Sequence, residues 1–90
     1  MLITWDEKKN EANFKKHGVW FEEAQAVIVN PLSLMAPNEH SDGDRMEYLG
    51  YSAENRLLYL VTVEKDEEII RIVSARIATN HEREKYEEGI

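Results

Sequence analysis

The sequence has no cysteine, few prolines and glycines, and no long hydrophobic run. The lack of cysteine excludes disulfide bonds and thiolate metal ligands, and it fits a reducing compartment. A membrane-spanning helix needs about 20 consecutive apolar residues, and no stretch approaches that length. No signal-peptide pattern opens the chain. We therefore expect a cytoplasmic protein that makes no membrane contact.

Basic residues are also scarce, with 11 Lys and Arg against 18 Asp and Glu and a formal net charge of -7. Neutralisation of phosphates dominates nucleic-acid affinity, so this balance argues against an extended nucleic-acid-binding surface. It favours a partner with a basic surface. An RNA site must then depend on a local basic patch, and the most basic stretch is residues 8–16.

Ninety residues correspond to one domain, which we place at residues 1–90. Its organising stretch is Ile69–Ile77, which is apolar at both alternating positions and therefore predicts an interior strand. If its pleat is regular, Arg71 and Arg76 lie on opposite faces.

Short polar segments at 53–56 and 65–68 predict hairpin turns, and therefore an antiparallel sheet. The expected strands are 2–5, an edge strand at 32–36, and 45–52, 57–64 and 69–77, with a polar loop at 38–44 able to flank a site.

Three helices are expected. Asp6 is a good N-cap for the first, which runs to His17 and ends at Gly18. The second covers 21–28, and a Thr79–Glu82 capping box begins the third at 80–88. The sequence therefore predicts an α+β fold, a small antiparallel sheet packed by two N-terminal helices and one C-terminal helix.

The first helix has an unusual composition. Asn10, Asn13, Phe14 and His17 share one face at helical spacing, and only Phe14 is strongly apolar.

An ordered set of motifs extends over nearly the whole chain. They are Trp5-Asp6, Lys9-Asn10 with Asn13, Lys16-His17-Gly18-Val19, Phe21-Glu22-Glu23-Ala24, Asn30-Pro31, Leu49-Gly50-Tyr51-Ser52, Arg71-Ile72-Val73-Ser74-Ala75-Arg76 with Ala78, Glu82-Arg83 and Tyr86-Glu87. The set resembles the BrnT family, toxins of type II toxin–antitoxin modules.

The resemblance implies a RelE-like ribonuclease toxin fold and a metal-independent endoribonuclease that needs no cofactor and blocks translation. It also implies a cognate antitoxin with a DNA-binding domain, in a complex that represses its own operon. A homodimer or a hetero-oligomer with the antitoxin fits this description.

Two positions depart from the family pattern. Ile77 stands where lysine is usual, which removes a basic group beside the expected site. Trp20 stands where a small capping residue is frequent, which costs the second helix roughly 1 kcal/mol unless another group replaces the cap.

RNA cleavage without a metal needs a base, an acid and cations around the phosphorus. His17 can serve as base or acid near neutral pH, and Arg45 and Arg76 can clamp a phosphate. Tyr86 can orient or donate, which completes the catalytic candidates, while Lys16 and Arg71 are substrate-binding candidates.

Each candidate also has a structural explanation. The helix dipole favours His17 at a helix C-terminus, Arg71 can pair with an acidic neighbour, and Tyr86 can cover the core. The histidines, His17, His40 and His81, lack metal-ligand spacing, so no metal site is expected.

We expect His17, Arg45 and Arg76 to converge on one phosphate-sized pocket, with Lys16 and Tyr86 at its rim. A simple meander places Arg45 and Arg76 at opposite ends of the sheet, so convergence requires unequal strands or a bend.

Two function classes remain open. One is a ribonuclease toxin held by its antitoxin. The other is a binding module that keeps the toxin fold and partner surface without RNA chemistry. The acidic balance and Ile77 favour the second class, and the motif set favours the first.

Overall fold

The structure, a computed structural model, describes residues 1–38, 44–66 and 68–89. Its elements in chain order are β1 Leu2–Thr4, α1 Glu7–His17, α2 Phe21–Val29, β2 Leu34–Pro37, β3 Arg45–Tyr51, β4 Leu57–Asp66, β5 Ile69–Ile77 and α3 Asn80–Gly89. The α+β fold class is confirmed. Residues 39–43, most of the polar loop expected to flank a site, lie outside the described residues.

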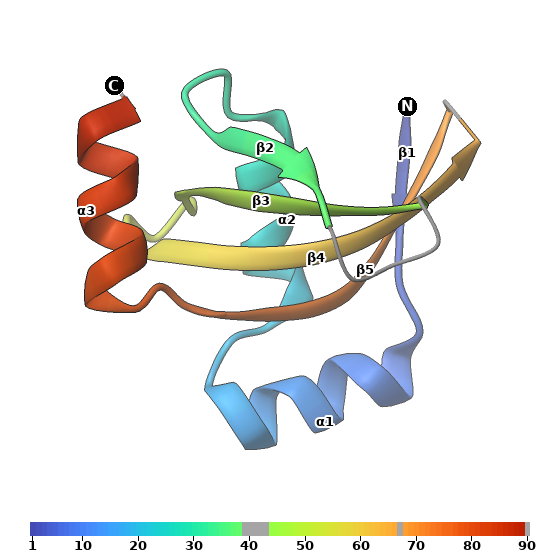
Figure 1. Cartoon of the computed structure of the whole chain (residues 1–90). Helices are drawn as coiled ribbons and strands as arrows, with labels where there is room; N and C mark the ends of the chain where they lie inside the picture. Colours follow the sequence, from blue (N-terminus) through green and yellow to red (C-terminus); the bar gives the residue numbers. More distant parts are fainter. Residues whose placement is uncertain (39–43, 67, 90) are drawn as a thin grey trace.

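The described strands form one sheet in the order β1-β5-β4-β3-β2. Strands β2 to β5 are antiparallel as the hairpin turns predict, and β5 is interior as expected. Strand β1 was not foreseen beside β5, and it pairs in parallel, which makes the whole sheet mixed. Figure 1 shows α2 across one face of this sheet, α1 beneath the β5 edge and α3 at one end.

A β-bulge interrupts the pleat of β5. Val61 pairs with Ser74 but Thr62 pairs with Ile72, so Val73 is an extra residue without a partner on β4. Because of this extra residue, side chains after Val73 point to the face opposite the one that a regular strand would give them. Arg71 and Arg76 therefore share one face, and the regular pleat that would separate them is absent from this strand.

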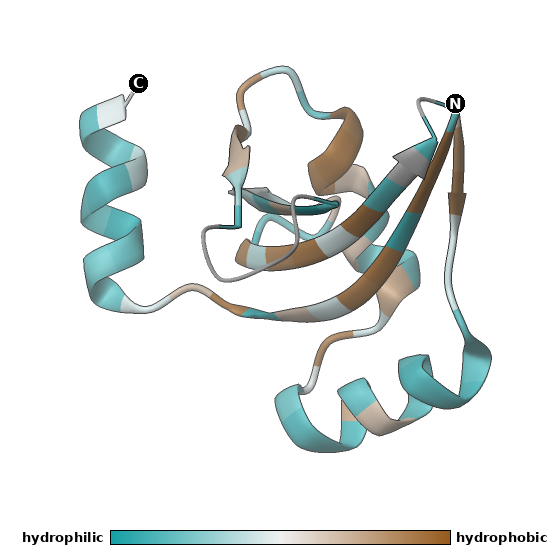
Figure 2. Cartoon of the chain, turned by 45° about the vertical axis from the view of Figure 1, so that its right-hand side comes forward, coloured by the Kyte–Doolittle hydropathy of each residue, from teal (hydrophilic) through white to brown (hydrophobic). Residues whose placement is uncertain are grey.

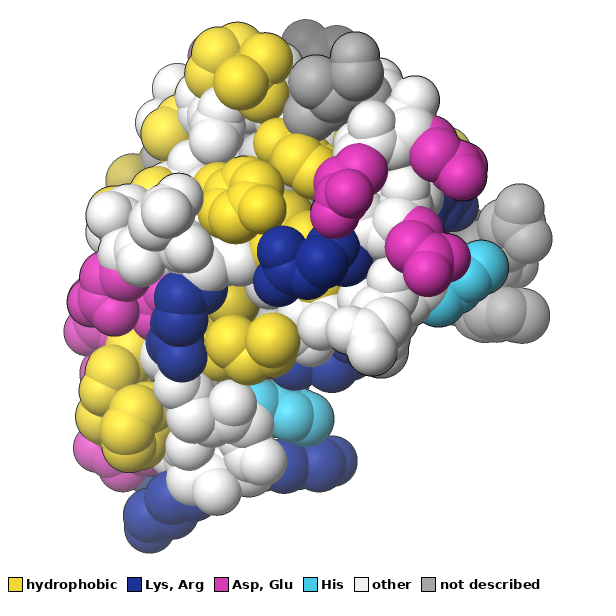
Figure 3. Space-filling model, turned by 90° about the vertical axis from the view of Figure 1, so that its left-hand side faces the viewer, with side chains coloured by type: hydrophobic (Ala, Val, Ile, Leu, Met, Phe, Trp, Pro, Cys, Tyr) yellow, Lys and Arg dark blue, Asp and Glu magenta, His cyan; other side chains and the backbone are white. Residues whose placement is uncertain are grey.

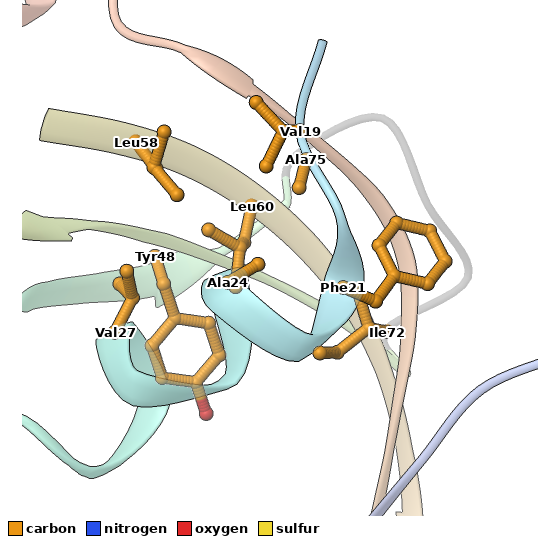
Figure 4. Close-up of a cluster of buried hydrophobic side chains, with 9 residues drawn as sticks. All are labelled: Val19, Phe21, Ala24, Val27, Tyr48, Leu58, Leu60, Ile72 and Ala75. Atoms are coloured by element: carbon orange, nitrogen blue, oxygen red, sulfur yellow. The ribbon is translucent and has the colours of Figure 1, made fainter. Parts of the chain in front are cut away.

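The main core lies between α2 and the inner face of the sheet, the face that α2 covers. Figure 4 shows its nine buried side chains, which are Val19, Phe21, Ala24, Val27, Tyr48, Leu58, Leu60, Ile72 and Ala75. A second cluster, Leu49, Leu57 and Tyr86, lies beneath α3 on the outer face. Figure 2 shows that α1 and α3 are largely hydrophilic, whereas α2 carries more hydrophobic positions.

Two buried asparagines attach α1 to the rest of the molecule. The Asn13 Oδ1 accepts from Ala75 N at 3.2 Å, and the Asn13 Nδ2 donates to Ala75 O at 2.8 Å. The side chain thus extends the hydrogen-bonding of β5 beyond the point where β1 ends. The same Nδ2 also donates to Val19 O at 2.9 Å, which ties the α1–α2 turn to this edge.

Asn10 replaces the cap that Trp20 cannot provide. Trp20 makes no side-chain capping bond to the described part of α2, and its ring stacks on Phe14 at 4.1 Å between centroids. The Asn10 Oδ1 instead accepts from Phe21 N at 2.7 Å, and its Nδ2 donates to Glu22 Oε1 at 2.7 Å. The expected loss of capping energy is therefore offset from a neighbouring helix.

No helix in the described ranges is long and apolar enough to cross a membrane.

We expect Asn13→Ala to lower the free energy of unfolding by about 3 kcal/mol, because each buried polar group left unpaired costs roughly 1–3 kcal/mol. Urea unfolding monitored by circular dichroism measures this change. Asn80→Ala is the control, since Asn80 is exposed at the first residue of α3. A loss below about 1 kcal/mol for Asn13→Ala would contradict the importance of these bonds.

Candidate functional site

Arg45 and Arg71 flank Val63, one on each side, on the outer face, which is the sheet face opposite α2. Val63 pairs with Arg45 on β3 and with Arg71 on β5, and both arginines are exposed. With strands ~4.8 Å apart, their Cα atoms lie roughly 10 Å from each other. They present two cations to solvent at one end of this face.

Arg76 lies on the same face, towards α3, and is already paired. Its Nη1 donates to Glu82 Oε1 at 2.8 Å and its Nη2 donates to Glu82 Oε2 at 2.9 Å. Its guanidinium also lies 4.3 Å from the centre of the Tyr59 ring. Arg76 therefore has a bidentate carboxylate in the geometry that a phosphate would use.

Glu82 also forms the expected capping box. Its Oε1 accepts from Thr79 N at 2.9 Å, and Glu82 N donates to the Thr79 Oγ1 at 3.1 Å. The hydrogen bonds from Arg76 are the main cause that lowers the pKa of Glu82, and the same contact raises the pKa of Arg76. One carboxylate thus begins α3 and occupies the arginine.

Tyr59 lies beneath this ion pair. Burial, followed by a hydrogen bond with Glu47, raises the pKa of Tyr59 to about 12. The phenol therefore stays protonated near neutral pH, and its hydroxyl can donate a hydrogen bond to the Glu47 carboxylate.

His17 and Lys16 lie at the β5 edge of the sheet. With Lys9, they line a hollow of about 240 Å³ whose other wall includes Val73 and Ser74 of the bulge. Figure 3 shows a histidine among basic side chains in the lower part of this view, while other Lys and Arg side chains are dispersed among hydrophobic and acidic ones.

The expected single pocket around His17, Arg45 and Arg76 is not formed by the described residues. Arg45 pairs with Val63 and Arg76 with Tyr59, four residues apart along β4, which is ~13 Å. The meander argument against convergence holds, because β3 and β5 run parallel on either side of β4. Arg45 instead lies close to Arg71.

Tyr86 is the buried residue of α3 and belongs to the second core cluster. Its ring meets Tyr51 edge to face at 5.5 Å between centroids. This placement agrees with the alternative explanation of Tyr86 as a core residue.

Sequence reasoning did not foresee that Glu82 holds Arg76. The capping box itself could have predicted this pair, because its glutamate points back towards the end of the preceding strand, where Arg76 lies. Tyr59 and Ser74 gave no such signal, since their position beside the arginines depends on strand register and on the bulge.

Among residues 1–38, 44–66 and 68–89, no three His, Asp or Glu side chains group in a way that could hold a metal ion.

Comparison with known proteins assigns the family. A profile described as the ribonuclease toxin BrnT of type II toxin–antitoxin systems matches residues 5–82. The chain belongs to the BrnT family.

The fold also resembles a solved member of the BrnT family, the ribonuclease toxin BrnT of Brucella abortus, whose crystal structure was determined at 1.1 Å resolution. The TM-score is 0.69, the sequences are 22% identical, and the match covers 87% of this chain and 96% of that one. At this identity the likeness concerns the fold alone. None of the curated proteins compared with the sequence matches it.

Ile77, the position at which the resemblance leads us to expect lysine, lies on the other side of the sheet. Ile77 pairs with Leu58, whose side chain belongs to the inner core, so the two share that face. A lysine at position 77 would begin on the face opposite Arg76. Its absence therefore does not remove a cation from the Arg76 side of the strand.

We expect Glu82→Gln to destabilise the fold by about 1 kcal/mol at pH 7, because glutamine keeps the capping box but loses the ionic pair with Arg76. The lowered pKa of Glu82 means that this stabilisation is complete above its ordinary value of 4.5 and is lost as pH falls through the lowered value. The difference from the parent should therefore disappear in acid.

Thermal unfolding between pH 7 and pH 3 measures that difference. Glu84→Gln, exposed on α3, is the matched control. A Glu82→Gln deficit that persists unchanged at pH 3 would contradict an ionic origin.

Proposed function

We propose that this chain is a metal-independent endoribonuclease toxin that cleaves RNA, inhibits translation and is neutralised by an antitoxin with a DNA-binding domain. The family match over residues 5–82 carries the proposal. The arginines of the outer face and the histidine at its edge supply the required chemistry. The toxin and antitoxin form a hetero-oligomer that represses their operon.

The scissile phosphate binds over Ser74. Arg71 and Arg76 share the face of Ser74, each two ladder steps away, or ~7 Å along the strand. Their long side chains can reach a phosphate between them. His17 approaches from the β5 edge, where it lines the same hollow as Ser74.

Each residue then has a distinct role. His17, acting as the base, takes the proton of the 2′-hydroxyl, whose oxygen attacks phosphorus to form a 2′,3′-cyclic phosphate, while the bond from phosphorus to the 5′-oxygen breaks and that oxygen takes a proton from water. Arg71 and Arg76 stabilise the charge that develops on the phosphate oxygens, and Lys16 adds a further cation. Tyr86 positions α3 through the core. Arg45 binds an adjacent phosphate of the same strand.

One observation favours a second candidate, a toxin-fold binding module without RNA chemistry. Glu82 already holds Arg76 in a bidentate pair, so RNA must displace a carboxylate to reach this arginine. The net charge of -7 adds an unfavourable field for RNA. Such a module would bind the antitoxin and contribute to repression of the operon.

We expect Arg76→Ala to slow RNA cleavage about 30- to 1,000-fold, which corresponds to a loss of about 2–4 kcal/mol of transition-state stabilisation. Cleavage of labelled RNA in EDTA and translation arrest after induced expression without the antitoxin are the two measurements. Lys15→Ala is the charge-matched control, since Lys15 is exposed in the last turn of α1.

An Arg76→Ala variant that is folded and arrests translation like the parent removes Arg76 from the mechanism. A parent chain that is inert on RNA, both with and without EDTA, removes the catalytic proposal and leaves the binding module.

We also expect the chain to co-purify with the product of its neighbouring gene, a basic antitoxin. The association rate constant should fall as salt rises from 50 to 300 mM, because opposite charges steer the encounter. Stopped-flow mixing of the separated proteins measures this rate. A chain that remains alone after co-expression, or a rate that salt leaves unchanged, contradicts the prediction.

A further inference from the structure

A separate hollow of about 720 Å³ lies between α1, the α1–α2 turn and the β3–β4 turn. We call it the acidic groove. Its position differs from the proposed RNA site, because none of its lining residues belongs to the outer-face ladder of Arg71, Ser74 and Arg76.

The apolar part of the acidic groove is a pair of stacked rings. Phe14 and Trp20 lie nearly parallel, with 9° between their planes, and each remains 40% exposed. The exposed part of each ring can accept another planar or cationic group.

Carboxylates surround these rings. Five glutamates and one arginine line the groove: Glu7, Glu11, Glu22, Glu23, Glu54 and Arg56. The arginine is already paired with Glu23 and donates to Gly18 O at 3.2 Å. Within the described residues, the carboxylates of Glu11 and Glu54 accept no hydrogen bond. Glu54 lies near enough to Arg56 for electrostatic attraction, but five carboxylates against one guanidinium leave the groove with an excess of negative charge beside an aromatic surface.

Its walls are fastened to one another. The Ser52 Oγ and the Arg56 Nε donate to the Glu23 carboxylate at 2.7 and 2.9 Å. These bonds join α2 to the β3–β4 turn, and the contact from Arg56 to Gly18 adds the α1–α2 turn. The pKa of Glu23 is lowered chiefly by its hydrogen bonds from Arg56, so this network is charged at neutral pH. Because the walls of the groove are already ordered, binding of a partner has a smaller entropic cost.

Helix α1 separates its charges between two sides. Glu7, Glu11 and Phe14 follow helical spacing along the acidic groove. Lys9, Lys16 and His17 line the other hollow, at the β5 edge. The same helix thus presents a basic side towards the proposed RNA site and an acidic, aromatic side away from it.

We propose that the acidic groove binds an Arg- or Lys-containing segment of a protein partner. A guanidinium or ammonium group can lie on the Phe14–Trp20 stack while its charge meets the carboxylates of Glu11 and Glu54. Single-stranded RNA would also find rings for stacking, but its phosphates would be repelled by the surrounding glutamates.

The choice of partner rests on the proposed function, because the antitoxin is the expected source of a basic segment. A DNA-binding antitoxin is expected to be basic, and a basic segment of it outside the DNA contact could occupy the groove while the complex represses the operon. Docking in the groove would leave the side of α1 with Lys16 and His17 uncovered by that segment.

The test compares two charge-matched double variants. Glu11→Gln with Glu54→Gln removes two charges from the groove, and Glu84→Gln with Glu88→Gln removes two from α3. Calorimetry at 50 and 150 mM salt measures the Kd for the purified antitoxin and for a ten-residue arginine–glycine peptide. We expect the groove variant to weaken both at least tenfold and the control to change them less than twofold.

Trp20→Ala supplies a second measurement that does not alter charge. It should also weaken the peptide at least tenfold, with unchanged circular dichroism. Peptide and antitoxin affinities that are unaffected by both groove variants overturn the proposal, and the proposed toxin–antitoxin pairing then stands without it.

The remaining outcomes are also distinct. A chain that binds the peptide through the groove but ignores the antitoxin supports the site and contradicts the proposed partner. A single-stranded RNA oligonucleotide that binds more tightly to the Gln variant and more weakly to Trp20→Ala would identify a stacking site for RNA, and would overturn the proposal.

Discussion

The arrangement of this molecule depends on hydrogen bonds from two buried asparagines of a hydrophilic helix. Asn13 pairs with both backbone groups of Ala75, and Asn10 caps α2. Such bonds are directional, whereas apolar contacts allow a helix to slide or rotate. They fix the rotation of α1 about its axis. His17 consequently faces the β5 bulge, and Glu11 and Phe14 face the acidic groove.

The bulge at Val73 has a comparable effect on the sheet. One extra residue moves Arg76 to the face of Arg71 and brings Ala75 into the core. Val73, the extra residue, also lines the hollow beside His17. A local irregularity in one strand thus places Arg71 and Arg76 on one face of the sheet, which a regular strand of this sequence would not do.

Charge is distributed by site and not spread evenly over this acidic chain. Glu82 joins the start of α3 to Arg76, so the helix and the proposed site share one ion pair. Five other glutamates line the groove of the Phe14–Trp20 stack, whereas Glu47 shares the outer face with Arg45, and Asp66 lines a hollow with Arg71. The net charge of -7 is therefore an average over surfaces of different charge, and the proposed RNA site and the proposed site for a basic partner lie on different surfaces of one small domain.

The sequence by itself determined the features that arise from neighbouring residues. Asp6 caps α1, Gly18 ends it at a φ of 71°, Thr79 and Glu82 begin α3, and the hairpin turns make β2 to β5 antiparallel. Only the tertiary structure decided the parallel pairing of β1 with β5, the bulge that places Arg71 and Arg76 on one face, and the roles of the asparagines. Caps and turns are short-range interactions that local residue types specify. Register and side-chain pairing across 62 residues, as between Asn13 and Ala75, follow from how the whole chain packs.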